Sequence, residues 1–102
     1  MNEFECLVPV LNVKNFAVAM EYYVKKLGFR KKWHWGEPAT FGCVTRGKIE
    51  IFICEGAQGQ AGMWMSIFVD DVDALHEEYT GSGAIIRQAP TNMPWGLREM
   101  KQ

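Results

Sequence analysis

The pattern of apolar and polar residues first predicts a strand–helix–strand unit between Val8 and Arg30. Apolar residues recur with a period of two up to Val13, which is typical of a strand that buries one face. A helical period follows, and its apolar stripe consists of Phe16, Ala19, Tyr23 and Leu27. Asn15 can cap the first free N–H groups of this helix, and Gly28 suits the left-handed conformation that ends many helices. Phe29 then begins a second extended run.

The same unit recurs in the second half of the chain. Asn15 corresponds to Asp71 at an offset of 56 positions, and Gly28 corresponds to Gly83 at an offset of 55. Residues 63–83 are again a predicted strand, an acidic cap and a helix. Two units of about 50 residues are too small to be stable separately. We therefore predict one domain of 102 residues, with module one at 1–55, a linker at 56–62 and module two at 63–102.

The remaining elements follow from the turn residues between the apolar runs. In module one we predict strands at 39–45 and 49–54, joined by a hairpin at 46–48. In module two we predict a strand at 64–69, a helix at 72–80, a strand at 83–88, a loop at 88–94 and a strand that begins at 95. By the repeat, the last strand of module two would lie beyond Gln102, so this module looks truncated. Its edge would then be either exposed or covered by a partner chain.

Strand alternation predicts which side chains share a face. Leu11, Val13 and the isoleucines of 49–54 would lie under the helix. The opposite face would collect Val8, Val10, Asn12, Glu50, Phe52 and Cys54 and, in module two, Trp64, Ser66 and Phe68. A concave surface of aromatic groups with few polar ones is typical of a small-molecule site. Alternatively, Glu50 faces water on a half-exposed sheet, although Phe52 and Trp64 would then also be exposed. Trp33, Trp35 and Trp95 lie near turns, where an aromatic ring can face a ligand.

Composition and motifs exclude several classes of function. The net charge of −1 and the lack of a basic stripe argue against nucleic acid, and no apolar run approaches the length of a membrane span. Three cysteines and no signal peptide indicate reduced thiols in a cytoplasmic protein. The chain has no phosphate-binding glycine loop, nucleophile elbow or CxxC motif. His34 and His76 have no second ligand at a suitable spacing, so we interpret them as structural or surface residues.

Three segments together resemble a known family. LNVKNFAVAMEYYVKKLGF at 11–29 is similar to the first helix module of the glyoxalase/bleomycin-resistance/dioxygenase superfamily, also called the vicinal oxygen chelate superfamily. VDDVDALHEEY at 69–79 and PWGLRE at 94–99 resemble its bleomycin-resistance branch. The resemblance implies an α+β fold in which two βαβββ modules form a cupped mixed sheet with helices on the outer face. It also implies a homodimer that holds ligands in the concavity.

The resemblance also bears on metal binding and activity. Metal-using members draw ligands from the first and last strands of each module, which here correspond to Val8, Trp64, Glu50 and a position beyond Gln102. Only Glu50 could bind a metal ion, so we expect no cofactor. The resemblance implies a non-catalytic protein that sequesters an antibiotic-like ligand, planar or cationic, stacked on Trp64, Phe52 and Trp95, with Glu50 meeting a positive group. A metal-dependent lyase, isomerase or dioxygenase is the alternative, and a fold used only for assembly is a third possibility.

Overall fold

Four strands of the first half form one mixed sheet in the order β1-β4-β3-β2. The structure is a computed structural model that describes residues 3–56 and 65–101. The strands are β1 (Val10–Val13), β2 (Arg30–Trp35), β3 (Phe41–Arg46) and β4 (Ile49–Glu55). β1 runs parallel to β4, and the other neighbours are antiparallel. The edge position of β1 fits Pro9, the residue before it, because proline cannot donate a ladder hydrogen bond.

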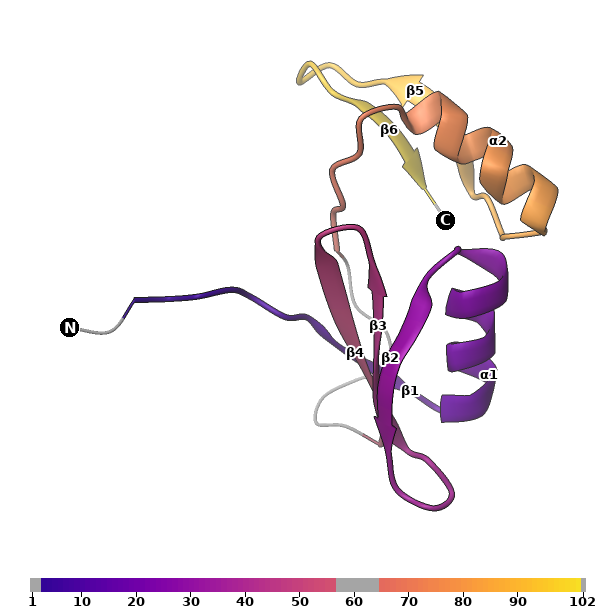
Figure 1. The fold of residues 1–102 in the computed structure, drawn as a ribbon. Coiled ribbons are helices and arrows are strands. Elements are labelled where there is room, and N and C mark those ends of the chain that lie inside the picture. Colours follow the sequence, from indigo (N-terminus) through magenta and orange to yellow (C-terminus); the bar gives the residue numbers. More distant parts are fainter. Residues whose placement is uncertain (1–2, 57–64, 102) are drawn as a thin grey trace.

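One helical segment covers one face of this sheet (Figure 1). Helix α1 (Phe16–Glu21) continues directly into a π-helical turn, η1 (Tyr22–Lys26). The Asn15 side chain caps its start by accepting a hydrogen bond of 3.0 Å from the Val18 N–H. The predicted cap and the predicted helix start are therefore confirmed, whereas the sequence pattern did not predict the π-helical turn.

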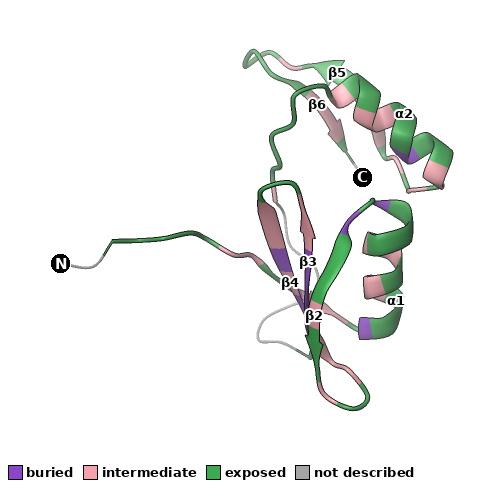
Figure 2. Cartoon of the chain, in the orientation of Figure 1, coloured by how far each residue is buried: buried purple, intermediate pink, exposed green. Residues whose placement is uncertain are grey.

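The core lies between the sheet and this helical segment. Ile51 and Ile53 of β4 are almost completely buried, and Phe16 and Leu27 of the helical segment pack against them. Gly42 of β3 faces the ring of Phe16, and an added Cβ there would lie only 2.8 Å from Cζ of the ring. Figure 2 shows the buried positions where the sheet and helix face each other. The predicted division of β4 into an isoleucine face and an opposite face is confirmed.

The second half contains α2 (Val72–Ser82) and the antiparallel pair β5 (Gln88–Asn92) and β6 (Arg98–Lys101). The Asp71 side chain accepts a hydrogen bond of 3.1 Å from Ala74 N–H, as the predicted cap requires. Gly83, with φ of 83°, ends the helix in the left-handed conformation. The two modules thus share the cap and the terminating glycine that the repeat predicted.

Two strand predictions in the second half were wrong. Residues 65–69 form no strand, although apolar and polar residues alternate there, and Phe68 is 81% exposed. The strand predicted at 83–88 begins only at Gln88 and extends into the segment predicted to be a loop. We predicted a loop there because of Pro90, which has no N–H to donate to a neighbouring strand. Pro90 is tolerated in β5 because it lies within the pairing irregularity between Gln88 and Thr91, where its backbone is not required to donate to β6.

The two halves meet where α2 contacts the end of η1. The buried Tyr79 hydroxyl donates to the Leu27 carbonyl over 3.0 Å, and Ile85 N–H donates to the Tyr22 hydroxyl over 3.0 Å.

At the other end of the chain, residues 3–9 leave the sheet as an extended arm (Figure 1), on which Phe4 is 99% exposed. In the parts of the chain that the structure describes, no helix combines the length and apolar character needed to cross a membrane.

Candidate functional site

The face of the sheet opposite α1 carries the candidate site. Val10 pairs with Phe52, Phe52 with Cys43, and Cys43 with Trp33. Because directly paired residues of neighbouring strands point to the same side, these four side chains lie in one row across all four strands. We call this side of the sheet the open face.

Three aromatic rings meet on the open face. The ring centroids of Trp33 and Phe52 lie 5.2 Å apart, those of Trp33 and Phe41 lie 5.3 Å apart, and those of Phe41 and Phe52 lie 5.5 Å apart. All three contacts are edge-to-face, the geometry that the charge distribution of aromatic rings favours. All three residues are half-buried, so this aromatic cluster combines a fixed arrangement with accessible ring surface.

A charged pair lies beside the aromatic cluster. Lys32 Nζ is 2.5 Å from Glu50 Oε2, and Cys43 Sγ is 3.7 Å from Glu50 Oε1. The hydrogen bond from Lys32 lowers the pKa of the Glu50 carboxyl and raises that of the Lys32 ammonium, so both stay charged near neutral pH. Burial raises the pKa of the Cys43 thiol, so that Cys43 is a protonated, unreactive group.

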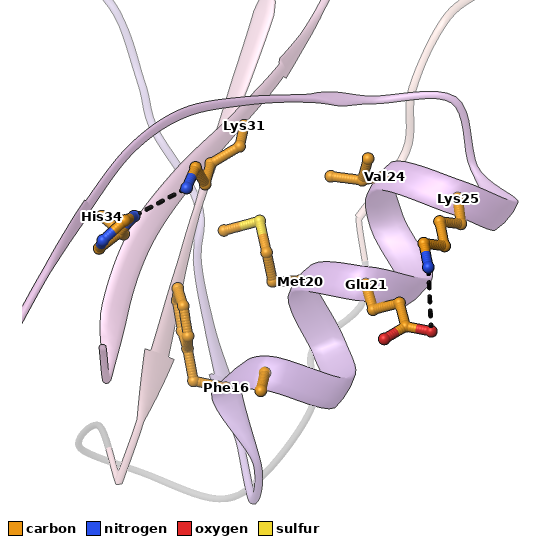
Figure 3. Close-up of a pocket in the computed structure, with 8 residues that line it drawn as sticks. Phe16, Met20, Glu21, Val24, Lys25, Lys31 and His34 are labelled. Carbon is orange, nitrogen blue, oxygen red and sulfur yellow. Dashed lines mark hydrogen bonds and ion pairs between the residues drawn. The ribbon is translucent and has the colours of Figure 1, made fainter. Parts of the chain in front are cut away.

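A bulge in β2 places Trp33 on the open face. Lys31 pairs with Val44, but the next paired residue, opposite Cys43, is Trp33, so that Lys32 is the extra residue. Lys31 points to the helix side because its partner Val44 belongs to the core, and its Nζ lies 2.9 Å from His34 Nδ1. Figure 3 shows both side chains beside the helix, at a groove of about 450 Å³ that is lined by Phe16, Ala17, Met20, Glu21, Val24, Lys25, Lys31 and His34.

The structure brings together part of the set of site residues predicted from the sequence. Asn12, Glu50 and Phe52 share the open face as expected. Val8 is half-buried and lies just before β1, in the extended arm. Trp64 lies outside the described residues.

The second-half residues of the predicted set do not lie on the four-stranded sheet. Ser66 and Phe68 belong to the irregular segment before α2 and are exposed. Trp95 is 65% exposed in the turn between β5 and β6, where its Nε1 donates to Glu99 Oε2 over 2.5 Å. The expectation that strand alternation places Ser66 and Phe68 on a sheet face was wrong, because this segment has no strand pairing.

Among the residues at or beside the aromatic cluster, the sequence did not predict Phe41, Lys32 and Cys43 as site residues. The hairpin at 46–48 contains the signal that could have found two of them. Once Arg46 is paired with Ile49, antiparallel register places Cys43 beside Phe52 and Phe41 beside Cys54. The side on which Trp33 lies depends on the bulge, which leaves no mark in the sequence pattern.

The residues at the family's metal-ligand positions do not fit a metal ion. The Val8 side chain has no donor atom, the indole of Trp64 is not a ligand, and Glu50 is bound by Lys32. Within 3–56 and 65–101 no three His, Cys, Asp or Glu side chains are grouped so that they could hold a metal.

The family model described as Glyoxalase/Bleomycin resistance protein/Dioxygenase superfamily matches residues 6–101. The chain therefore belongs to this superfamily, and the α+β fold with its mixed sheet is the fold of the bleomycin-resistance relatives. No protein of curated function matches the sequence significantly.

Solved structures give the same fold. The bleomycin-binding protein of bleomycin-producing Streptomyces verticillus, complexed with copper(II)-bleomycin, is 26% identical with a TM-score of 0.71, over 98% of this chain and 87% of that one. TioX from Micromonospora sp. ML1 is 20% identical with a TM-score of 0.74, over 95% and 87% of the two chains. A bleomycin resistance determinant encoded on the transposon Tn5 is 18% identical with a TM-score of 0.75, over 95% and 86%.

Proposed function

We propose that this protein binds and sequesters a planar, antibiotic-like small molecule without transforming it. The observation that carries the proposal is the aromatic cluster of Trp33, Phe41 and Phe52 on the face that no helix of the described residues covers. A flat ligand stacked there would gain roughly 0.5–1.5 kcal/mol per ring contact beyond the burial of its apolar area. The similarity to a protein that is named for binding bleomycin supports this class of function.

A purely binding role agrees with the chemistry of the open face. Cys43 is kept protonated by burial, and the Glu50 carboxylate is held by Lys32. Neither group is free to act as a nucleophile or base while these contacts persist. A cationic ligand that binds Glu50 must displace Lys32, so the cost of breaking the pair opposes cation binding.

The proposal includes a homodimer in the cytoplasm. Phe4 and Leu7 on the arm are 99% and 93% exposed, and Phe68 and Trp95 add further apolar surface in the second half. Exposed apolar surface of this extent is unusual for a monomer and is typical of an association surface. A partner chain that covers this surface would also enclose one side of the open face. A single chain contributes only the sheet to that site.

Titration calorimetry with bleomycin in a metal chelator tests the proposed function. We expect saturable binding that Phe52→Leu weakens, because leucine keeps apolar volume but removes a ring of the cluster. His76→Ala on α2 is the matched control and should change the affinity by less than a factor of about two, as is usual for substitutions away from a site. Should bleomycin and other planar ligands of the same size all fail to bind, the proposal is wrong.

A further inference from the structure

The charged groups beside the aromatic cluster are mainly cations. Arg30 pairs with Thr45, and Thr45 pairs with Glu50, so these three positions form the next row of the open face. Lys32, two residues after Arg30, lies on the same face, and its ammonium reaches Glu50 in this row. The row therefore contains two cationic side chains and one carboxylate. Its net charge is positive, although the chain as a whole carries −1.

The carboxylate of this row is already neutralised. Glu50 is 2.5 Å from Lys32, whereas the Arg30 side chain has no hydrogen bond or ion pair with any residue that the structure describes. Arg30, Lys31, Lys32 and Thr45 line a hollow of about 330 Å³. The Lys31 ammonium itself lies on the helix side, near His34 (Figure 3). An anion in this hollow would meet the free guanidinium, with Lys32 within reach.

The spacing connects this hollow to the aromatic cluster. Glu50 and Phe52 are two residues apart on β4, so their rows are about 7 Å apart along the strand. This is the width of a fused two-ring system. One flat ligand can therefore stack on the cluster and place a substituent in the hollow.

From this arrangement we infer that the open face selects planar aromatic ligands that carry an oxyanion, such as a carboxylate, sulfonate or phosphate. Arg30 and Lys32 bind the oxyanion, and the aromatic cluster binds the rings. Arginine is well suited to this role because its planar fork can donate two parallel hydrogen bonds to an oxyanion. The inference rests on the proposed function and adds the charge of the ligand, whereas the sequence alone predicted a planar or cationic ligand with a positive group at Glu50.

Two dyes that differ only in the anionic group provide the probe. 1-Anilinonaphthalene-8-sulfonate and N-phenyl-1-naphthylamine have the same rings, and only the first has a sulfonate. Fluorescence titration of the intact protein should give about two- to fivefold tighter binding of the sulfonate dye, the range for a partly exposed charge pair. Replacing Arg30→Gln and Lys32→Gln together should remove this preference and leave binding of the neutral dye within a factor of about two.

Two further variants make the test specific. Lys14→Gln combined with Lys101→Gln removes the same charge from exposed positions elsewhere and should preserve the preference. Glu50→Gln releases Lys32 and should increase the preference for the sulfonate dye. Thermal unfolding of each variant shows whether it is folded at the temperature of the titration.

The outcomes separate the inference from the proposed function. Equal affinity for both dyes in the native protein, or a preference that survives loss of Arg30 and Lys32, overturns the inference while planar-ligand binding stands. If neither dye binds and bleomycin also fails, the proposed function falls and the inference falls with it. The control variant at Lys14 and Lys101 supplies a further test. If it loses as much of the preference for the sulfonate dye as the variant at Arg30 and Lys32 does, the inference is also overturned, because the net charge of the protein would then explain the preference.

Discussion

Arg46 and Glu78 join the two halves of the chain through a bidentate ion pair. Nη1 of Arg46 is 2.6 Å from Glu78 Oε2, and Nη2 is 2.8 Å from Oε1. Nη1 also donates to the carbonyl of Leu27 over 2.8 Å, at the end of the first helical segment. One guanidinium at the end of β3 thus fixes the positions of α2 and of the residue that follows η1.

Removing this guanidinium should weaken the contact between the halves. Arg46→Met should lower the free energy of unfolding more than Glu78→Gln does, because it also leaves the Leu27 carbonyl without its arginine donor. Both side chains are partly exposed, so the coupling between them should be only about 0.5–1 kcal/mol. Urea unfolding of the two single variants and the double variant measures this coupling. Additive effects would mean that the pair contributes nothing.

The same pair predicts a dependence of stability on pH. The hydrogen bond from Arg46 lowers the pKa of Glu78 in the folded protein below its ordinary value of 4.5. A group whose folded pKa is depressed contributes stability above its unfolded pKa and loses it as the pH falls through the folded pKa. The difference in stability between the native protein and Glu78→Gln should therefore be constant above about pH 5 and shrink on acidification below it. A difference that grows on acidification would contradict the assignment.

The two helix caps predict two similar losses of stability. Asn15→Ala and Asp71→Ala each remove the acceptor of one free N–H group and should each cost about 0.5–2 kcal/mol. Lys14→Ala is a suitable control because its side chain is exposed beside the first cap. Chemical unfolding monitored by circular dichroism gives all three values. If Asp71→Ala costs no more than the control, its cap is not a determinant of the fold.

The sequence determines the repeated parts of the fold well. Asn15 and Asp71 both cap helices from the extended conformation, and Gly28 and Gly83 both have positive φ, as the offset predicted. These features depend on single residue types with strong local preferences, namely a short polar side chain and a residue without Cβ. Ile51 and Ile53 are similar, because the period of two alone gives their face.

Features that depend on pairing partners could not be predicted. The segment 65–69 has strand-like alternation but no paired strand, and Pro90 lies in a strand because the pairing is interrupted there. The candidate site depends on such a feature, since the bulge of β2 turns Trp33 onto the open face. Glu50 and Phe52 were predicted there because β4 is regular.

Substitutions of two neighbouring residues on β4 should affect the free energy of unfolding and the ligand affinity differently. Ile53 is 0% exposed in the core, so Ile53→Ala should cost about 2–5 kcal/mol of unfolding free energy through the cavity it leaves. Phe52→Leu, on the opposite face, should cost less stability and lower the affinity for planar ligands. Thermal unfolding and ligand titration of both variants check this. Equal losses of stability would place Phe52 in the core rather than in a site.

The proposed homodimer predicts the mass of the protein in solution. Sedimentation at micromolar concentration should give twice the 11.6 kDa mass of one chain, with an interface of more than about 1,000 Å². Leu7→Asp on the exposed arm should shift the distribution toward monomer, because it places a charge in an apolar contact. A native protein that sediments at the mass of one chain would rule out the dimer.

The most direct test of a metal-free binding site on the open face is tryptophan fluorescence during a titration with a planar ligand in the presence of a chelator. Trp33 lies in the aromatic cluster, so a ligand stacked on the open face should quench tryptophan emission in a saturable way, and the chelator should not alter the binding. Trp33→Phe should reduce the quenching while binding persists in calorimetry, because a ring remains in the cluster. Binding without any change in emission, or binding that the chelator abolishes, would contradict a metal-free site on the open face.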